Sequence, residues 1–126
     1  MKTTFVGLLI LAFTFSAWSQ TNKGTEKTIV GEVVDVQCYV SGATGPGKGE
    51  KHKDCAIQCA NGGMPLAILE DKTNTLYVAG QTKVAMKSAN EMLIPFIAEK
   101  VKVSGRVYEK GGVKLILIKK ISKQNE

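Results

Sequence analysis

Short segments rich in β-branched residues, with alternating apolar and polar positions, follow one another along the chain beyond its first 20 residues. This alternation is typical of strands that bury one face. In the first segment, for example, Val34 and Val36 alternate with Asp35 and Gln37. The pattern predicts five strands, at residues 28–38, 64–69, 75–79, 101–108 and 113–118.

Two short helices are predicted between these strands. Residues 51–60 contain neither glycine nor proline, and the Asn-Gly-Gly that follows favours the end of a helix. Ser88 with Glu91 three residues later matches a capping box for a second helix at residues 92–97, which Pro95 must shorten or kink. The glycine-rich segment 41–50 is a predicted loop.

The order of these elements indicates the fold. We expect a mainly β protein, a five-stranded OB-type barrel with a helix between strands three and four and a short cysteine-bearing helix inserted between strands one and two. An open sheet with both helices on one face is the structural alternative.

The N-terminal segment has the pattern of a secretory signal peptide. Lys2 precedes the apolar residues 5–15, and small residues near Ser19 suit cleavage after it. The apolar run is too short for a membrane-spanning helix, and no later segment is apolar enough to span a bilayer. We therefore expect a secreted or periplasmic protein. The predicted parts are signal peptide 1–19, flexible leader 20–27, barrel domain 28–121 and polar tail 122–126.

The net charge is +6, and loss of Lys2 with the signal peptide leaves 16 basic side chains against 11 acidic ones. OB barrels that bind nucleic acid combine a basic groove with aromatic stacking platforms. Beyond the signal peptide the aromatics are few: Tyr39, Tyr77, Phe96 and Tyr108. Export also separates the protein from nucleic acid, so we expect no such partner.

All three cysteines and the single histidine lie within residues 38–59. If residues 51–60 are helical, His52, Cys55 and Cys59 are spaced i, i+3 and i+7 and share one face. Cys38, just before the loop, can fold back onto that face. Three thiols and one imidazole are a complete tetrahedral ligand set, so Cys38, His52, Cys55 and Cys59 are the candidate ligands of a Zn²⁺ or Cu(I) site. The protein is then a structural or carrier metal-binding protein.

Two other roles for the cysteines stay open. A disulfide from Cys38 to Cys55 or Cys59 would clamp the loop and contribute about 3 kcal/mol, and the protein would then be a non-enzymatic module that binds a protein or glycan. Alternatively, nearby lysines and a helix N-terminus favour a Cys55 thiolate and a redox-active site. The chain has no Cys-x-x-Cys motif and no catalytic triad, so we expect no enzymatic activity.

The cysteine pattern also supports a family resemblance. Cys38 precedes the glycine-rich loop, Cys55-Ala-Ile-Gln-Cys59 follows it, and Gly63-Met-Pro65 comes next. With the Val-x-Val-x-Gly-x-Val of residues 101–107, this pattern resembles small secreted bacterial OB-fold proteins of unassigned function. The resemblance spans about residues 28–121 and implies the fold rather than an activity.

Overall fold

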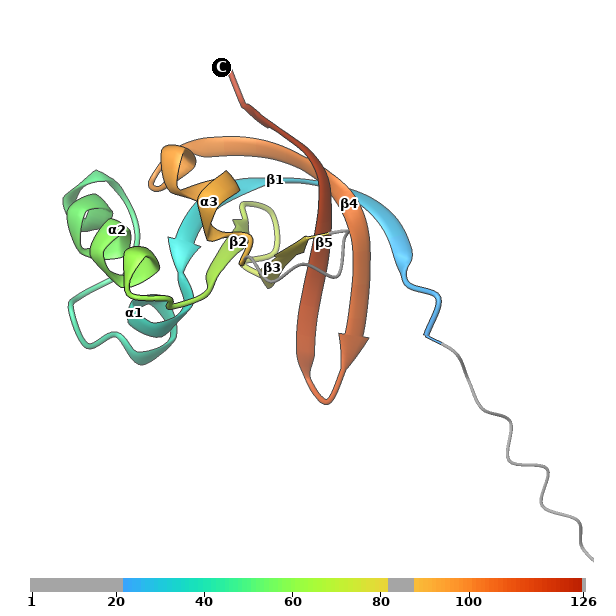
Figure 1. Cartoon of the computed structure of the whole chain (residues 1–126), viewed down its shortest axis with the longest axis horizontal. Coiled ribbons are helices and arrows are strands. Elements are labelled where there is room, and N and C mark those ends of the chain that lie inside the picture. The colour runs from blue at the N-terminus through green and yellow to red at the C-terminus, as the bar shows by residue number, and fades with distance from the viewer. Residues whose placement is uncertain (1–21, 82–87, 126) are drawn as a thin grey trace, which may run out of the picture.

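The computed structural model describes residues 22–81 and 88–125 (Figure 1). The predicted signal peptide, residues 1–19, lies outside the described residues.

Five strands close into a barrel (Figure 1). They are β1 Thr25–Asp35, β2 Leu66–Glu70, β3 Leu76–Gln81, β4 Lys100–Lys110 and β5 Val113–Lys123. Their order is β1-β2-β3-β5-β4, and β4 pairs back with β1. All pairings are antiparallel except the parallel pair β3 and β5. The predicted five-stranded OB-type barrel is confirmed, and the open-sheet alternative is wrong.

Helices occupy the two predicted places. Between β1 and β2 lie α1 Val36–Ser41, the 3-10 turn η1 Glu50–His52 and α2 Lys53–Asn61. Between β3 and β4 lie α3 Asn90–Leu93 and the 3-10 turn η2 Ile94–Phe96, where Pro95 limits the α-helix as expected. Figure 1 shows α1 and α2 together at the end of the barrel where β1 ends, away from the β4–β5 hairpin.

The barrel interior is filled mainly by aliphatic side chains from the strands and from α3, and Tyr77 of β3 is buried among them. The largest of the fully buried ones are Ile29, Leu66, Ile68, Leu93, Ile97 and Ile116. Two glycines allow the tight curvature that so small a barrel needs. A Cβ at Gly31 would lie 2.1 Å from the carbonyl oxygen of Leu69, and a Cβ at Gly105 would lie 2.3 Å from that of Leu117. The β4–β5 register also shifts between Ser104 and Gly105, as in a β-bulge.

The first strand differs from its prediction at both ends. It starts at Thr25, before the predicted domain start, because Thr25 pairs with Val107 of β4. The prediction that it runs to Cys38 is wrong, since it stops at Asp35 and Cys38 lies on α1. The Asp35 carboxylate accepts a hydrogen bond from the backbone N–H of Cys38 at 2.8 Å and so caps α1. At the other end of the chain, β5 continues to Lys123, into the predicted tail.

Candidate metal centre

The helical insertion between β1 and β2 carries all four predicted ligands. Cys38 lies on α1, His52 ends η1, and Cys55 and Cys59 lie one turn apart on α2. The other face of α2 packs on the barrel core through Ala56 and Ala60, which are both buried. Packing against the barrel therefore fixes the position of the helix that presents two of the thiols.

Three thiols form the centre of the site. The Sγ atoms of Cys38, Cys55 and Cys59 all lie within 4.8 Å of one another. Cys38 is buried, whereas Cys55 and Cys59 are half-buried. An ion among the three sulfurs would therefore be shielded on the Cys38 side and accessible from the α2 side.

A second group overlaps the first. Ligand atoms of Asp35, Cys38 and His52 also lie within 4.8 Å of one another. His52 Nε2 lies 2.9 Å from Asp35 Oδ2, and both side chains are buried. Asp35 thus contacts the histidine through one carboxylate oxygen and caps α1 through the other. The sequence analysis does not predict a role for Asp35. Asp35 favours the start of a helix and Gly42 favours its end, so their spacing could have indicated a short helix between them.

His52 is not placed as the sequence predicts. Residues 50–52 form a 3-10 turn rather than the first turn of the α-helix, so the i, i+3, i+7 spacing does not describe one continuous helical face. The side chain instead contacts Asp35. All four predicted residues converge on one region, but they do so as two groups that share Cys38.

The surroundings of Cys38 and Cys59 favour the protonated form of these two thiols. Burial is the main cause that raises the pKa of Cys59, to about 11, with the neighbouring Cys38 and Asp35 adding to it. A hydrogen bond with Thr44 lowers the pKa of Cys38, but burial and the Asp35 carboxylate together outweigh it and raise that pKa. Both residues hold their protons at neutral pH, and a bound cation would displace them.

All three cysteines are free thiols in the structure. The alternative prediction, a disulfide from Cys38 to Cys55 or Cys59, is therefore not formed there. Three separate thiol groups are therefore available that could hold a metal ion.

The glycine-rich loop is held against α1 and β1. A Cβ at Gly47 would lie 2.4 Å from the Tyr39 Cα, so only glycine permits this approach. The backbone N–H of Gly49 donates a hydrogen bond to the Glu32 carboxylate on β1. These contacts fix the loop between the Cys38 helix and the segment that bears the other ligands.

Comparison of the chain with known protein families, curated proteins and solved structures gives no match. Among the helices of the described residues, none has the length and apolar character needed to cross a membrane.

Proposed function

We propose that this protein is an exported metal-binding protein that holds one soft metal ion through Cys38, Cys55 and Cys59. The observation that carries the proposal is that three sulfur atoms, presented by two helices, lie within 4.8 Å of one another. Thiolates are soft ligands that select Cu(I), Zn²⁺ and related ions over hard cations. Export is supported by the signal-peptide pattern of residues 1–19.

The ligand set favours Cu(I). Three thiolates without a nitrogen ligand suit a soft monovalent ion, whereas Zn²⁺ in proteins almost always takes four ligands. His52 belongs to the group that shares Cys38 and is held by Asp35. Zn²⁺ is the second candidate, because His52 would supply the fourth ligand of the Cys3His set predicted from the sequence.

Exposure of the site favours a carrier over a purely structural role. Cys55 and Cys59 are half-buried, so a bound ion can be reached from solvent, unlike the closed structural zinc sites of small domains. We therefore propose a metal carrier without catalytic activity, which receives an ion and transfers it to a partner protein.

Elemental analysis of purified protein tests this proposal. Protein expressed with copper or zinc in the medium is expected to hold about one ion per chain, and Cys55→Ser is expected to lose most of it because one sulfur ligand is missing. Asp54→Asn is the matched control, since Asp54 is an exposed neighbour of Cys55 on α2 and should retain the ion. Equal metal content in Cys55→Ser and the wild type would contradict the proposal.

A further inference from the structure

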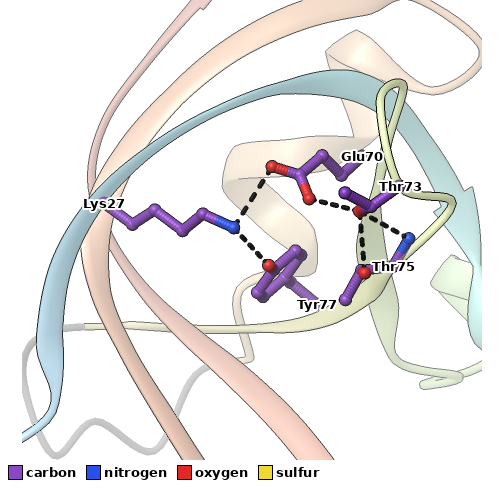
Figure 2. Close-up of polar contacts among 5 residues, drawn as sticks. All are labelled: Lys27, Glu70, Thr73, Thr75 and Tyr77. Atoms are coloured by element: carbon purple, nitrogen blue, oxygen red, sulfur yellow. Dashed lines mark hydrogen bonds and ion pairs between the residues drawn. The ribbon is translucent and has the colours of Figure 1, made fainter.

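A second polar cluster lies far from the cysteines, near the start of β1. It joins Lys27 on β1, Glu70 at the end of β2 and Tyr77 on β3 (Figure 2). The Lys27 ammonium donates a hydrogen bond to the Tyr77 hydroxyl, lies 3.2 Å from Glu70 Oε1 and sits 4.7 Å from the centroid of the Tyr77 ring. Three strands of the barrel therefore converge on one ammonium group.

The turn after β2 fixes the carboxylate of this cluster. Thr73 donates its hydroxyl to Glu70, and Thr73 and Thr75 are joined by a hydrogen bond of 2.7 Å (Figure 2). Glu70 is 8% exposed and Tyr77 is 4% exposed. The Lys27 side chain is 39% exposed, so the ion pair is only partly buried, and ion pairs in contact with solvent contribute little to stability. Stability alone gives little reason for a buried carboxylate and a lysine in this position.

Lys27 and Tyr77 also line a pocket. Its volume is about 410 Å³, within the range of sites that bind small molecules. The other walls come from the chain before β1 and from the β4–β5 hairpin, and they include Lys23, Val107 and Lys114. The walls thus combine amine groups with an aromatic ring and an aliphatic side chain.

The charges around the pocket leave one cation unpaired. Glu70 neutralises Lys27, and Glu109, also in the lining, neutralises Lys114. Lys23 forms no ion pair with any residue in the described part of the chain. An ammonium has three N–H donors, of which Tyr77 and Glu70 occupy two on Lys27, and this side chain is 39% exposed. The pocket therefore offers one fixed N–H donor and one excess positive charge.

We propose that this pocket binds a small organic carboxylate, whose negative group contacts Lys27 and Lys23 and whose apolar part lies against Val107. A single negative charge matches the single unpaired lysine. The site is separate from the metal centre, because Lys27 and Asp35 are eight residues apart along β1, a path of about 26 Å along the curved strand. It adds a second ligand to the proposed metal carrier and does not depend on metal binding.

Amide chemical shifts of the isotope-labelled protein test the proposal with three matched probes. Benzoate, phenyl phosphate and benzyl alcohol each contain one aromatic ring. They differ in the polar group, which is a carboxylate, a phosphate and an uncharged hydroxyl respectively. Benzoate is expected to cause saturable shifts at Lys27, Tyr77 and Val107 and to bind more tightly than phenyl phosphate, while benzyl alcohol causes none. Absence of saturable shifts with benzoate would overturn the site. Tighter binding of phenyl phosphate would overturn the assignment to carboxylates.

Two variants test whether the ligand binds in this pocket. Lys27→Met is expected to weaken benzoate binding about tenfold, since a charge-assisted hydrogen bond is lost. Because that variant leaves the Glu70 carboxylate without its cation, Lys23→Ala serves as a second variant that leaves the cluster intact, and it is also expected to weaken binding. Lys120→Ala removes an exposed lysine outside the pocket and should bind benzoate as the wild type does. Unchanged binding in both Lys27→Met and Lys23→Ala would contradict the proposal, whatever the metal content of the protein.

Discussion

Asp35 connects the end of the barrel strand to the candidate metal centre. One carboxylate oxygen accepts the Cys38 backbone N–H, and the other lies 2.9 Å from His52 Nε2. The residue is fully buried, so neither contact can be replaced by water without rearrangement. This single side chain thus sets where α1 begins and how the histidine is oriented.

Replacement of Asp35 should therefore destabilise the fold. Asp35→Ala removes the helix cap and leaves His52 buried without its partner, and we expect a loss of about 3 kcal/mol in the free energy of unfolding. Asp35→Asn retains an acceptor for the cap and should lose about 1 kcal/mol. Urea denaturation measures both, with the exposed Asp54→Ala as control. An Asp35→Ala variant as stable as the control would contradict this role.

The thiol pKa values predict how metal binding depends on pH. Burial raises the pKa of Cys59 to about 11, and burial with Asp35 raises that of Cys38, so both thiols are protonated at neutral pH. Binding must release at least these two protons, so affinity rises with pH, by about a hundredfold for each pH unit in the range where both thiols are protonated. Competition with a chelator of known proton affinity measures this dependence. An affinity that stays constant between acidic and neutral pH would show that these thiols are not ligands.

At the scale of elements, the strands were more predictable than the helical insertion. The β4–β5 hairpin follows from its alternating pattern and its Gly-Gly turn. By contrast, Val36 and Val40 favour a strand, yet α1 forms because Asp35 caps one end and Gly42, with φ of 63°, ends the other. A helix of six residues is too short for its periodicity to be seen in the sequence.

The glycine-rich loop should be sensitive to substitution at one position in particular. In Gly47→Ala the new Cβ would collide with the Tyr39 backbone and displace α1, so we expect about 2 kcal/mol lower stability and at least about tenfold weaker metal binding. Gly45→Ala is the matched control, because Gly45 also has positive φ but has no atom within 4 Å of its Cβ position. Thermal denaturation and metal titration compare the two. Equal effects in both would show that loop packing does not position Cys38.

At the scale of the whole molecule, the barrel and the metal centre differ in how far the sequence predicts them. The order of strands and helices along the chain follows from local patterns, and the structure confirms it. The site depends on contacts that no local pattern records, namely the Asp35–His52 pair and the 3-10 turn that redirects His52. The sequence could therefore identify which cysteines converge, but not that His52 is paired with an acid.

Metal binding by the three cysteines and a disulfide between two of them predict different numbers of free thiols. The thiols can be counted in protein purified without reductant, in denaturant with and without a chelator, and the metal content is measured in the same samples. We predict three free thiols per chain once the chelator is present and about one ion released per chain. One free thiol per chain and no metal would show a disulfide and contradict the account.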